Sequence, residues 1–117
     1  MHKSISINRL KHALIATIQV DLSKKVLDEF RQDLLDTIVM SSTVKGVLID
    51  LSGVKTLDRQ DMDSLMEIVS AVEVMGRICL FVGIRPGIAM ALVNISYKTE
   101  QLNCVNNIDD GLAVLER

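Results

Sequence analysis

The stretch GVLIDLSGVKTLDRQDM, residues 46–62, contains the signals that decide the fold. It begins with GVLIDL (46–51), a continuous apolar run with one acid, which is typical of a strand buried on both faces of a sheet. After a polar turn, helical spacing of apolar residues starts at Arg59. A buried strand, a turn and a helix in this order form the repeating unit of an α/β protein with a mostly parallel sheet.

The segments on either side continue this alternation. Residues 3–8 and 12–19 are rich in β-branched residues and predict two strands, with NRLK (8–11) as the turn of a hairpin. Periodicity and end signals predict the remaining elements: a helix from about Ser23 to 40–42, a second from Arg59 to a stop at Gly76, a strand over 78–83, a helix from Pro86 to about Tyr97, a short strand near 103–105 and a helix over about 109–116. We therefore predict one α/β domain, residues 1–117, of order β-β-α-β-α-β-α-β-α, with a mostly parallel mixed sheet that opens in a hairpin and about four helices.

The composition excludes several classes of protein. The formal net charge is −2 and no basic run occurs, which argues against direct nucleic-acid binding. Aromatic residues make up only 3% of the chain, so a site of stacked rings is disfavoured. The two cysteines, Cys79 and Cys104, are too few for a disulfide framework. No stretch approaches the length of a membrane span or has the arrangement of a signal peptide, so we expect a cytoplasmic protein.

Two strand-to-helix turns, residues 52–60 and 84–87, are the places where sites tend to form in parallel sheets. In the first, Asp58 is a predicted N-cap of the helix that follows, and Asp61 then holds the reciprocal position of a capping box. Capping does not account for Arg59, because a cation in the first turn opposes the helix dipole. In the second turn, Arg85 is either a solvated loop cation or a contact for a partner or a phosphate group.

The helix expected after Pro86 is apolar on nearly every side, over the sequence IAMALV (88–93). A helix of this kind is normally buried all round, whereas in so small a domain one side should face water. We therefore expect an oligomer or partner interface on this helix, with Met90 as a first candidate.

No catalytic or metal-binding constellation is recognisable. His2 and His12 lie away from both strand-to-helix turns, so a Ser–His or Cys–His nucleophile is disfavoured, and GIRPGIA (83–89) lacks the lysine of a phosphate-binding loop. The acids of residues 58–63 do not have the spacing of a calcium loop. We expect no enzymatic activity, no metal and no cofactor.

The chain resembles the STAS domain family of anti-sigma-factor antagonists over essentially its whole length. The opening hairpin and helix fit this family, and GVLIDLSGVKTLDRQDM (46–62) is similar to its strand, loop and helix around an Asp-Ser phosphorylation site. VMGRICLFVGIRPGIAMALV (74–93) resembles the RsbS type, which are small scaffold proteins of bacterial stressosomes. The resemblance implies the STAS fold.

The resemblance also implies a non-enzymatic regulatory module in bacterial stress signalling and the regulation of transcription. In the family, a switch serine/threonine kinase is held by the unphosphorylated domain and released after it phosphorylates the Ser that follows the Asp. RsbS-type proteins co-assemble with larger STAS paralogues, so homo- or hetero-oligomers are expected. The regulatory loop and partner contacts would then include Asp58, Gln60, Asp61, Arg85, Pro86 and Gly87.

One position departs from the family pattern. Asp58 matches the family's Asp, and Arg59 stands where the phospho-acceptor Ser belongs. Arginine has no hydroxyl group to accept a phosphoryl group, and its charge is opposite to that of phosphate. Thr56 and Ser64 are the nearby hydroxyls, of which Thr56 is expected to be more accessible.

A phospho-receiver domain of a two-component system is the alternative class. Its length and βα alternation are suitable, and Asp50 ends a hydrophobic strand as a receiver's phosphate acceptor does. A receiver also needs an acidic pair after its first strand and a lysine late in the chain on a strand. SISINRLKHAL (4–14) contains no acid, and Lys98 is not on a predicted strand, so the STAS module is favoured.

Overall fold

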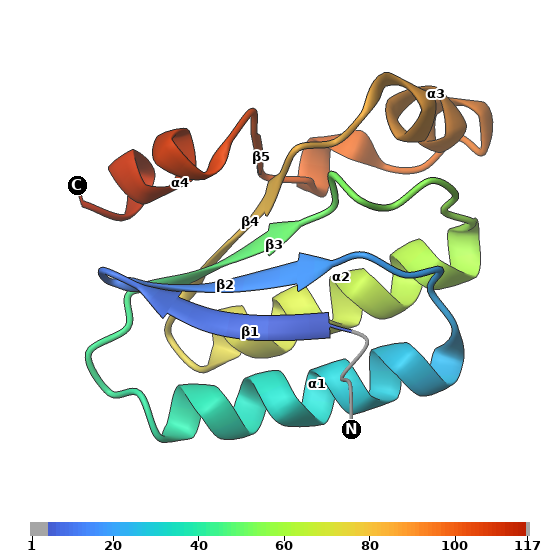
Figure 1. Ribbon diagram of the computed structural model, residues 1–117. Coiled ribbons are helices and arrows are strands. Elements are labelled where there is room, and N and C mark those ends of the chain that lie inside the picture. The colour runs from blue at the N-terminus through green and yellow to red at the C-terminus, as the bar shows by residue number, and fades with distance from the viewer. Residues whose placement is uncertain (1–4, 117) are drawn as a thin grey trace.

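A five-stranded sheet of order β1-β2-β3-β4-β5 runs through the protein (Figure 1). The computed structural model describes residues 5–116. Its elements in chain order are β1 (Ile5–Leu10), β2 (Ala13–Ile18), α1 (Lys24–Val39), β3 (Gly46–Asp50), α2 (Arg59–Val74), β4 (Ile78–Val82), α3 (Pro86–Asn94), a 3-10 turn (Thr99–Gln101), β5 (Cys104–Val105) and α4 (Ile108–Leu115). The predicted order of strands and helices is confirmed.

Among the strands of residues 5–116, only the first pair is antiparallel. β1 and β2 form the hairpin, and β2, β3, β4 and β5 then pair in parallel. In the parallel part, Thr17 lies beside Asp50 and Asp50 beside Val82, so the carboxyl ends of β2, β3 and β4 reach the same edge of the sheet. The expectation of a mostly parallel mixed sheet with an N-terminal hairpin is confirmed.

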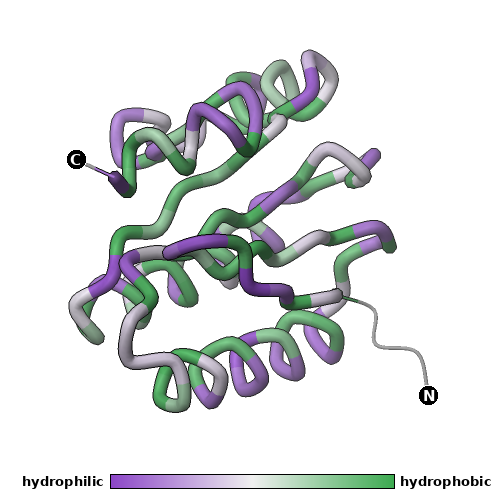
Figure 2. The backbone as a smooth tube through the Cα atoms, turned by 60° about the vertical axis from the view of Figure 1, so that its left-hand side comes forward, coloured by the Kyte–Doolittle hydropathy of each residue, from purple (hydrophilic) through white to green (hydrophobic). Residues whose placement is uncertain are grey.

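The two faces of the sheet are covered unequally. Helices α1 and α2 lie side by side against one face, and α4 lies on the other (Figure 1). The larger core, on the side of α1 and α2, also takes in Ile88 and Leu92 of α3, while the smaller core joins Leu112 and Leu115 of α4 to Leu48. The central strands are mostly hydrophobic, whereas hydrophobic and hydrophilic residues alternate along α1 (Figure 2).

Gly46 allows α4 to pack closely on the sheet. A Cβ atom at this position would lie 2.5 Å from a methyl carbon of Leu115 and 2.7 Å from the carbonyl oxygen of Ile78. Both approaches are closer than carbon atoms tolerate, and one of them is to backbone. Only glycine therefore fits at the start of β3 with α4 in this place.

The helices begin and end at residues that the sequence indicates. Ser23 caps α1 and Asn107 caps α4, each accepting a hydrogen bond from a backbone amide in the first turn. Gly76, with a φ of 82°, follows the C-cap of α2, and the amide of Arg77 donates to the carbonyl of Val72. This is the Schellman arrangement in which glycine is preferred, so the predicted stop at Gly76 is confirmed.

Two predicted boundaries were wrong. The hairpin turn is Lys11 and His12, with Lys11 at a φ of 55°, because residues 8–10 of the expected turn continue the ladder of β1 opposite β2. Helix α3 ends at Asn94 and not near Tyr97. Ser96 adopts a φ of 55° there and closes a second Schellman turn, in which the amide of Tyr97 donates to the carbonyl of Leu92.

Candidate partner surface at the carboxyl edge of the sheet

The two strand-to-helix turns meet at the carboxyl edge of the sheet. Val54 and Lys55 of the β3–α2 loop and Arg85, Pro86 and Gly87 at the start of α3 line a hollow of about 290 Å³. Arg85, Pro86 and Gly87 are all exposed, as is Lys55. The structure therefore brings the two predicted site segments together on one open surface.

Buried apolar anchors give the β3–α2 loop its shape. Leu51, Val54 and Leu57 are buried, and the amide of Leu51 donates to the carbonyl of Val82 at 2.9 Å. Every third residue is thus fixed in the core, and the polar residues between them face solvent. Thr56 is exposed in this way, two positions before the N-cap Asp58 of α2.

Asp58 and Asp61 form the predicted capping box at the start of α2. The carboxylate of Asp58 accepts a hydrogen bond from the amide of Asp61, and the carboxylate of Asp61 accepts one from the amide of Asp58. Partial burial, followed by the negative charge of Asp58, raises the pKa of Asp61, although its hydrogen bond from the Asp58 amide opposes the shift. The two acids hold the loop and the helix at a fixed angle.

Arg59 points away from its own helix end and toward the end of α3. Its Nη2 donates a hydrogen bond to the carbonyl oxygen of Ile95, the C-cap residue of α3. The guanidinium carbon also lies 5.9 Å from the centre of the Tyr97 ring. A cation is unfavourable at the start of α2 but favourable at the negative end of α3, so these contacts explain a residue that capping leaves unexplained.

Tyr97 extends this connection to the second turn of α2. Its hydroxyl donates a hydrogen bond of 3.1 Å to the carboxylate of Asp63. Burial, the hydrogen bond to Asp63 and the charge of that carboxylate raise the pKa of Tyr97, and the positive charge of Arg59 lowers it. Arg59, Asp63, Tyr97 and Ile95 are thereby joined in one polar cluster, which we call the α2–α3 clasp.

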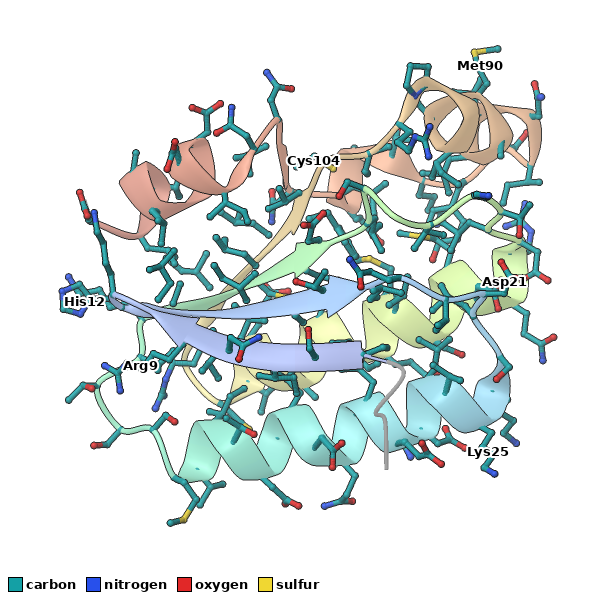
Figure 3. All side chains as sticks on the ribbon, viewed as in Figure 1. Arg9, His12, Asp21, Lys25, Met90 and Cys104 are labelled. Atoms are coloured by element: carbon teal, nitrogen blue, oxygen red, sulfur yellow. The ribbon has the colours of Figure 1, made fainter. Side chains whose placement is uncertain are left out.

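Helix α3 presents apolar side chains on its outer face. Ile88 and Leu92 are buried, whereas Met90 and Val93 are 59% and 61% exposed. Met90 projects away from the rest of the molecule (Figure 3). At the other end of α3, Arg85 occupies the N-cap position without a capping hydrogen bond from its side chain.

The other predicted loop residues border a second hollow. Asp58, Gln60, Asp61 and Ser64 line a space of about 530 Å³ that they share with the first half of α1. Gln60 is exposed and Ser64 is half-buried. The predicted contacts are thus divided between two hollows, with Arg85, Pro86 and Gly87 on the first and Asp58, Gln60 and Asp61 on the second. Met90 lines neither of them.

Asp50 stabilises the turn at the end of β3. Its carboxylate accepts a hydrogen bond of 2.9 Å from the amide of Ser52, which closes the turn after the strand. The sheet order β1-β2-β3-β4-β5 with an antiparallel first pair also differs from the 2-1-3-4-5 order of receiver domains. The receiver alternative is therefore not favoured.

Two further observations concern residues 5–116. No group of three or more His, Cys, Asp or Glu side chains in this range could hold a metal ion. None of the helices described there is long and apolar enough to cross a membrane.

The partners of Arg59 are the part of this surface that the sequence did not reveal. Ile95 and Tyr97 lie 36 and 38 positions further along the chain, and the helical periodicity predicts Tyr97 at the end of a helix. The one available signal is that Tyr97 is the single tyrosine in a chain with few aromatic residues.

The protein is an α/β domain with two loops joined at one edge of its sheet, and comparison with known proteins identifies its family. The sequence pattern of the STAS domain matches residues 4–111, and the chain belongs to the STAS domain family. The predicted family is confirmed.

One relative of this chain is a co-antagonist protein. The chain is 30% identical over 99 residues to the RsbT co-antagonist protein RsbRA of Bacillus subtilis (strain 168). This match covers 85% of the chain and 34% of RsbRA, so the chain spans about a third of the length of that relative.

Solved structures share the fold over nearly the whole chain. A serine-to-glutamate variant of RsbS from Moorella thermoacetica superimposes with a TM-score of 0.80 at 24% identity, covering 96% of this chain and 94% of that chain. A chain of the stressosome, described as a signal integration and transduction hub, gives a TM-score of 0.74 at 23% identity, covering 95% of this chain and 96% of that chain.

Proposed function

We propose that this protein is an anti-sigma-factor antagonist of the RsbS type, a non-enzymatic cytoplasmic scaffold that binds a switch serine/threonine kinase and larger STAS paralogues. The observation that carries the proposal is the exposed start of α2, where Arg59 directly follows the N-cap Asp58. This is the position at which the family pattern carries its phospho-acceptor serine.

The shape of the surface supports binding of a protein partner. Two loops and the outer face of α3 combine exposed polar groups with the exposed apolar side chains of Met90 and Val93. Exposed apolar area rimmed by polar residues is typical of a protein interaction site. The similarity to RsbRA and to a stressosome chain makes STAS paralogues the favoured partners.

Arg59 sets this protein apart within that function. A kinase that transfers the γ-phosphoryl group of ATP to a serine hydroxyl, with release of ADP, finds no hydroxyl at this position. The cluster around Arg59 also occupies the side chain with Ile95 and Tyr97. We therefore propose that the module stays in the unphosphorylated, partner-binding state.

Phosphorylation by the cognate kinase tests the assignment of Arg59. The wild-type protein, incubated with kinase and ATP, should remain unmodified in intact-mass spectrometry. The Arg59→Ser variant should gain one phosphoryl group on the new serine, since Asp58 still fixes the start of α2. A nucleophile displaced by about 1 Å can lose about 10²-fold in rate, so Ser64, one turn further on, is a poor substitute.

The alternative outcomes are equally clear. Stoichiometric phosphate on Thr56 or Ser64 of the wild-type chain would contradict a blocked acceptor. An Arg59→Ser variant that binds the kinase tightly but gains no phosphate would contradict the assignment of position 59. Purification of the protein from its host, with neither a STAS paralogue nor a serine/threonine kinase retained, would contradict the scaffold function itself.

A further inference from the structure

We infer that the sign of the charge at position 59 controls helix α3: a cation there fastens the helix to the start of α2, and an anion releases it. The inference rests on the proposed function in one respect, since α3 carries the apolar face assigned to partner binding. It explains how the residue at position 59 controls whether α3, and with it the apolar face, is held in place.

Arg59 binds at the end of α3 that attracts a cation. Ile95 is the C-cap of α3, and its carbonyl belongs to the end of the helix where partial negative charge accumulates. The last turn of α3 contains no basic residue of its own. Arg59 therefore supplies from another helix the cation that usually stabilises a helix end.

Tyr97 reinforces the contact between Arg59 and the end of α3. Tyr97 lies just beyond the Schellman turn of α3, and its ring receives the guanidinium of Arg59 while its hydroxyl donates to Asp63. Both Arg59 and Asp63 belong to the first two turns of α2. The clasp thus joins the two helices by three interactions, and Arg59 takes part in two of them.

Helix α3 is short and depends on such support. It has nine residues, of which only Ile88 and Leu92 are buried. Helices of this length are marginal without tertiary contacts, because nucleation costs more than a few hydrogen bonds return. Segments with few buried apolar side chains are also the first to open locally. Loss of the clasp should therefore loosen α3 before the rest of the fold.

The effect of the charge at position 59 depends on its sign, because this position faces the negative end of α3. A carboxylate or phosphate at position 59 would face the negative end of α3, where anions are unfavourable. It would also lose the stacking contact with Tyr97. Arg59 is accordingly a positioning residue for α3, and the inference predicts a graded response from cation to neutral group to anion.

Hydrogen exchange of the full chain, followed by mass spectrometry, tests this gradation. Peptides covering residues 86–97 should exchange within about threefold of wild type in Arg59→Lys, about threefold to tenfold faster in Arg59→Gln, and faster still in Arg59→Glu. Arg9→Gln is the matched control, because Arg9 is an exposed arginine on β1 that donates to Lys11 and Thr43, far from α3 (Figure 3). Its α3 peptides should exchange as in wild type.

Tyr97 gives a second readout that a general loss of stability would not produce. It is the only tyrosine and the chain has no tryptophan, so tyrosinate absorbance reports this side chain alone. Asp63→Asn should lower the pKa of Tyr97, because the hydrogen bond to Asp63 and the charge of its carboxylate both raise it, while circular dichroism shows that the fold is retained.

Two results would overturn the inference. Equal exchange in Arg59→Lys, Arg59→Gln and Arg59→Glu would show that charge at this position does not hold α3. An unchanged pKa of Tyr97 in Asp63→Asn would show that the clasp does not exist in solution. Neither result bears on whether wild-type protein retains a kinase or a paralogue, so failure of the clasp and failure of the proposed function are distinguishable.

Discussion

The amide of Asp61 donates a 2.7 Å hydrogen bond to the carboxylate of Asp58, and the amide of Asp58 returns one of 3.2 Å to the carboxylate of Asp61. The two acids cap the first turn of α2, and one of them, Asp58, directly precedes Arg59. Their reciprocal bonds therefore fix both the start of the helix and the exit of the loop. A change at Asp58 should affect stability as well as recognition.

Replacement of Asp58 separates these two effects. Asp58→Ala removes the capping acceptor and should lower the free energy of unfolding by about 0.5–2 kcal/mol. Asp58→Asn keeps an acceptor for the amide of Asp61 and should cost less, while removing the charge that a partner would meet. Urea denaturation of the three proteins, together with partner binding, measures both. Equal destabilisation by Ala and Asn would contradict the capping role.

Ser96→Gly should stabilise the protein. Ser96 has a φ of 55°, a conformation that costs an ordinary residue more than it costs glycine. The greater chain entropy of glycine in the unfolded state offsets part of this gain. We therefore expect the free energy of unfolding to rise by about 0.5 kcal/mol. Ser70→Gly is the control, because Ser70 is exposed within α2 and glycine there should be destabilising. Thermal unfolding that moves in the same direction for both variants would contradict the explanation.

The two cysteines should differ strongly in reactivity. Cys79 is 3% exposed, and burial together with the nearby Glu73 charge raises its pKa to about 12. Cys104 is exposed, although partial burial also raises its pKa. A thiol-specific reagent near pH 8 should label Cys104 first and reach Cys79 only on unfolding, because the thiolate is the reactive form. Rapid labelling of a Cys104→Ser variant in its native state would contradict this order.

The same shift predicts a pH dependence. The pKa of Cys79 is higher in the folded protein than its usual value of 9.0, so the folded state favours the thiol form. Its contribution to stability is complete below pH 9 and is lost as the pH rises toward 12. Cys79→Ala should flatten this part of the stability profile, as measured by urea denaturation across the alkaline range. A profile that is unchanged in the variant would assign the alkaline loss to other groups.

Substitution of Met90 tests the assembly surface. Met90→Lys places a charge in the exposed apolar face of α3 and should abolish assembly with STAS paralogues while leaving circular dichroism unchanged. Met40→Lys is a matched control, since Met40 is 85% exposed at the end of α1, where a cation suits the helix dipole. Size-exclusion chromatography with light scattering decides the outcome. Assembly that is lost equally in both variants would place the interface elsewhere.

Most of the fold was predictable because its signals are local. Alternating apolar runs and helical periods gave the order of elements, and Ser23, Asp58 and Gly76 marked helix ends at which the structure shows caps. The hairpin turn was misplaced because Asn8 is a good turn former, yet pairing with β2 extends β1 beyond it. Tertiary pairing overrode local preference at that point.

The surface was predictable in its segments but not in its contacts. Parallel topology was enough to bring residues 52–60 and 84–87 to the same edge of the sheet. The role of Arg59 depends on where α3 ends, far along the chain. The sequence pattern predicted this end near Tyr97, whereas the helix ends at Asn94. The positive φ at Ser96 ends α3 directly after its C-cap residue, Ile95. The carbonyl of Ile95 is thereby left free to accept the hydrogen bond from Arg59.

The order β1-β2-β3-β4-β5 also bears on how the chain reaches its folded state. Each strand pairs with the strand that precedes it in the sequence, so none has to insert between two strands that are already joined. Short sequence separation between partners lowers the entropy of loop closure and favours rapid folding. During synthesis the hairpin can form first, and each later strand and helix can dock as it leaves the ribosome. We expect the growing sheet to be extended in one direction, from β1 toward β5.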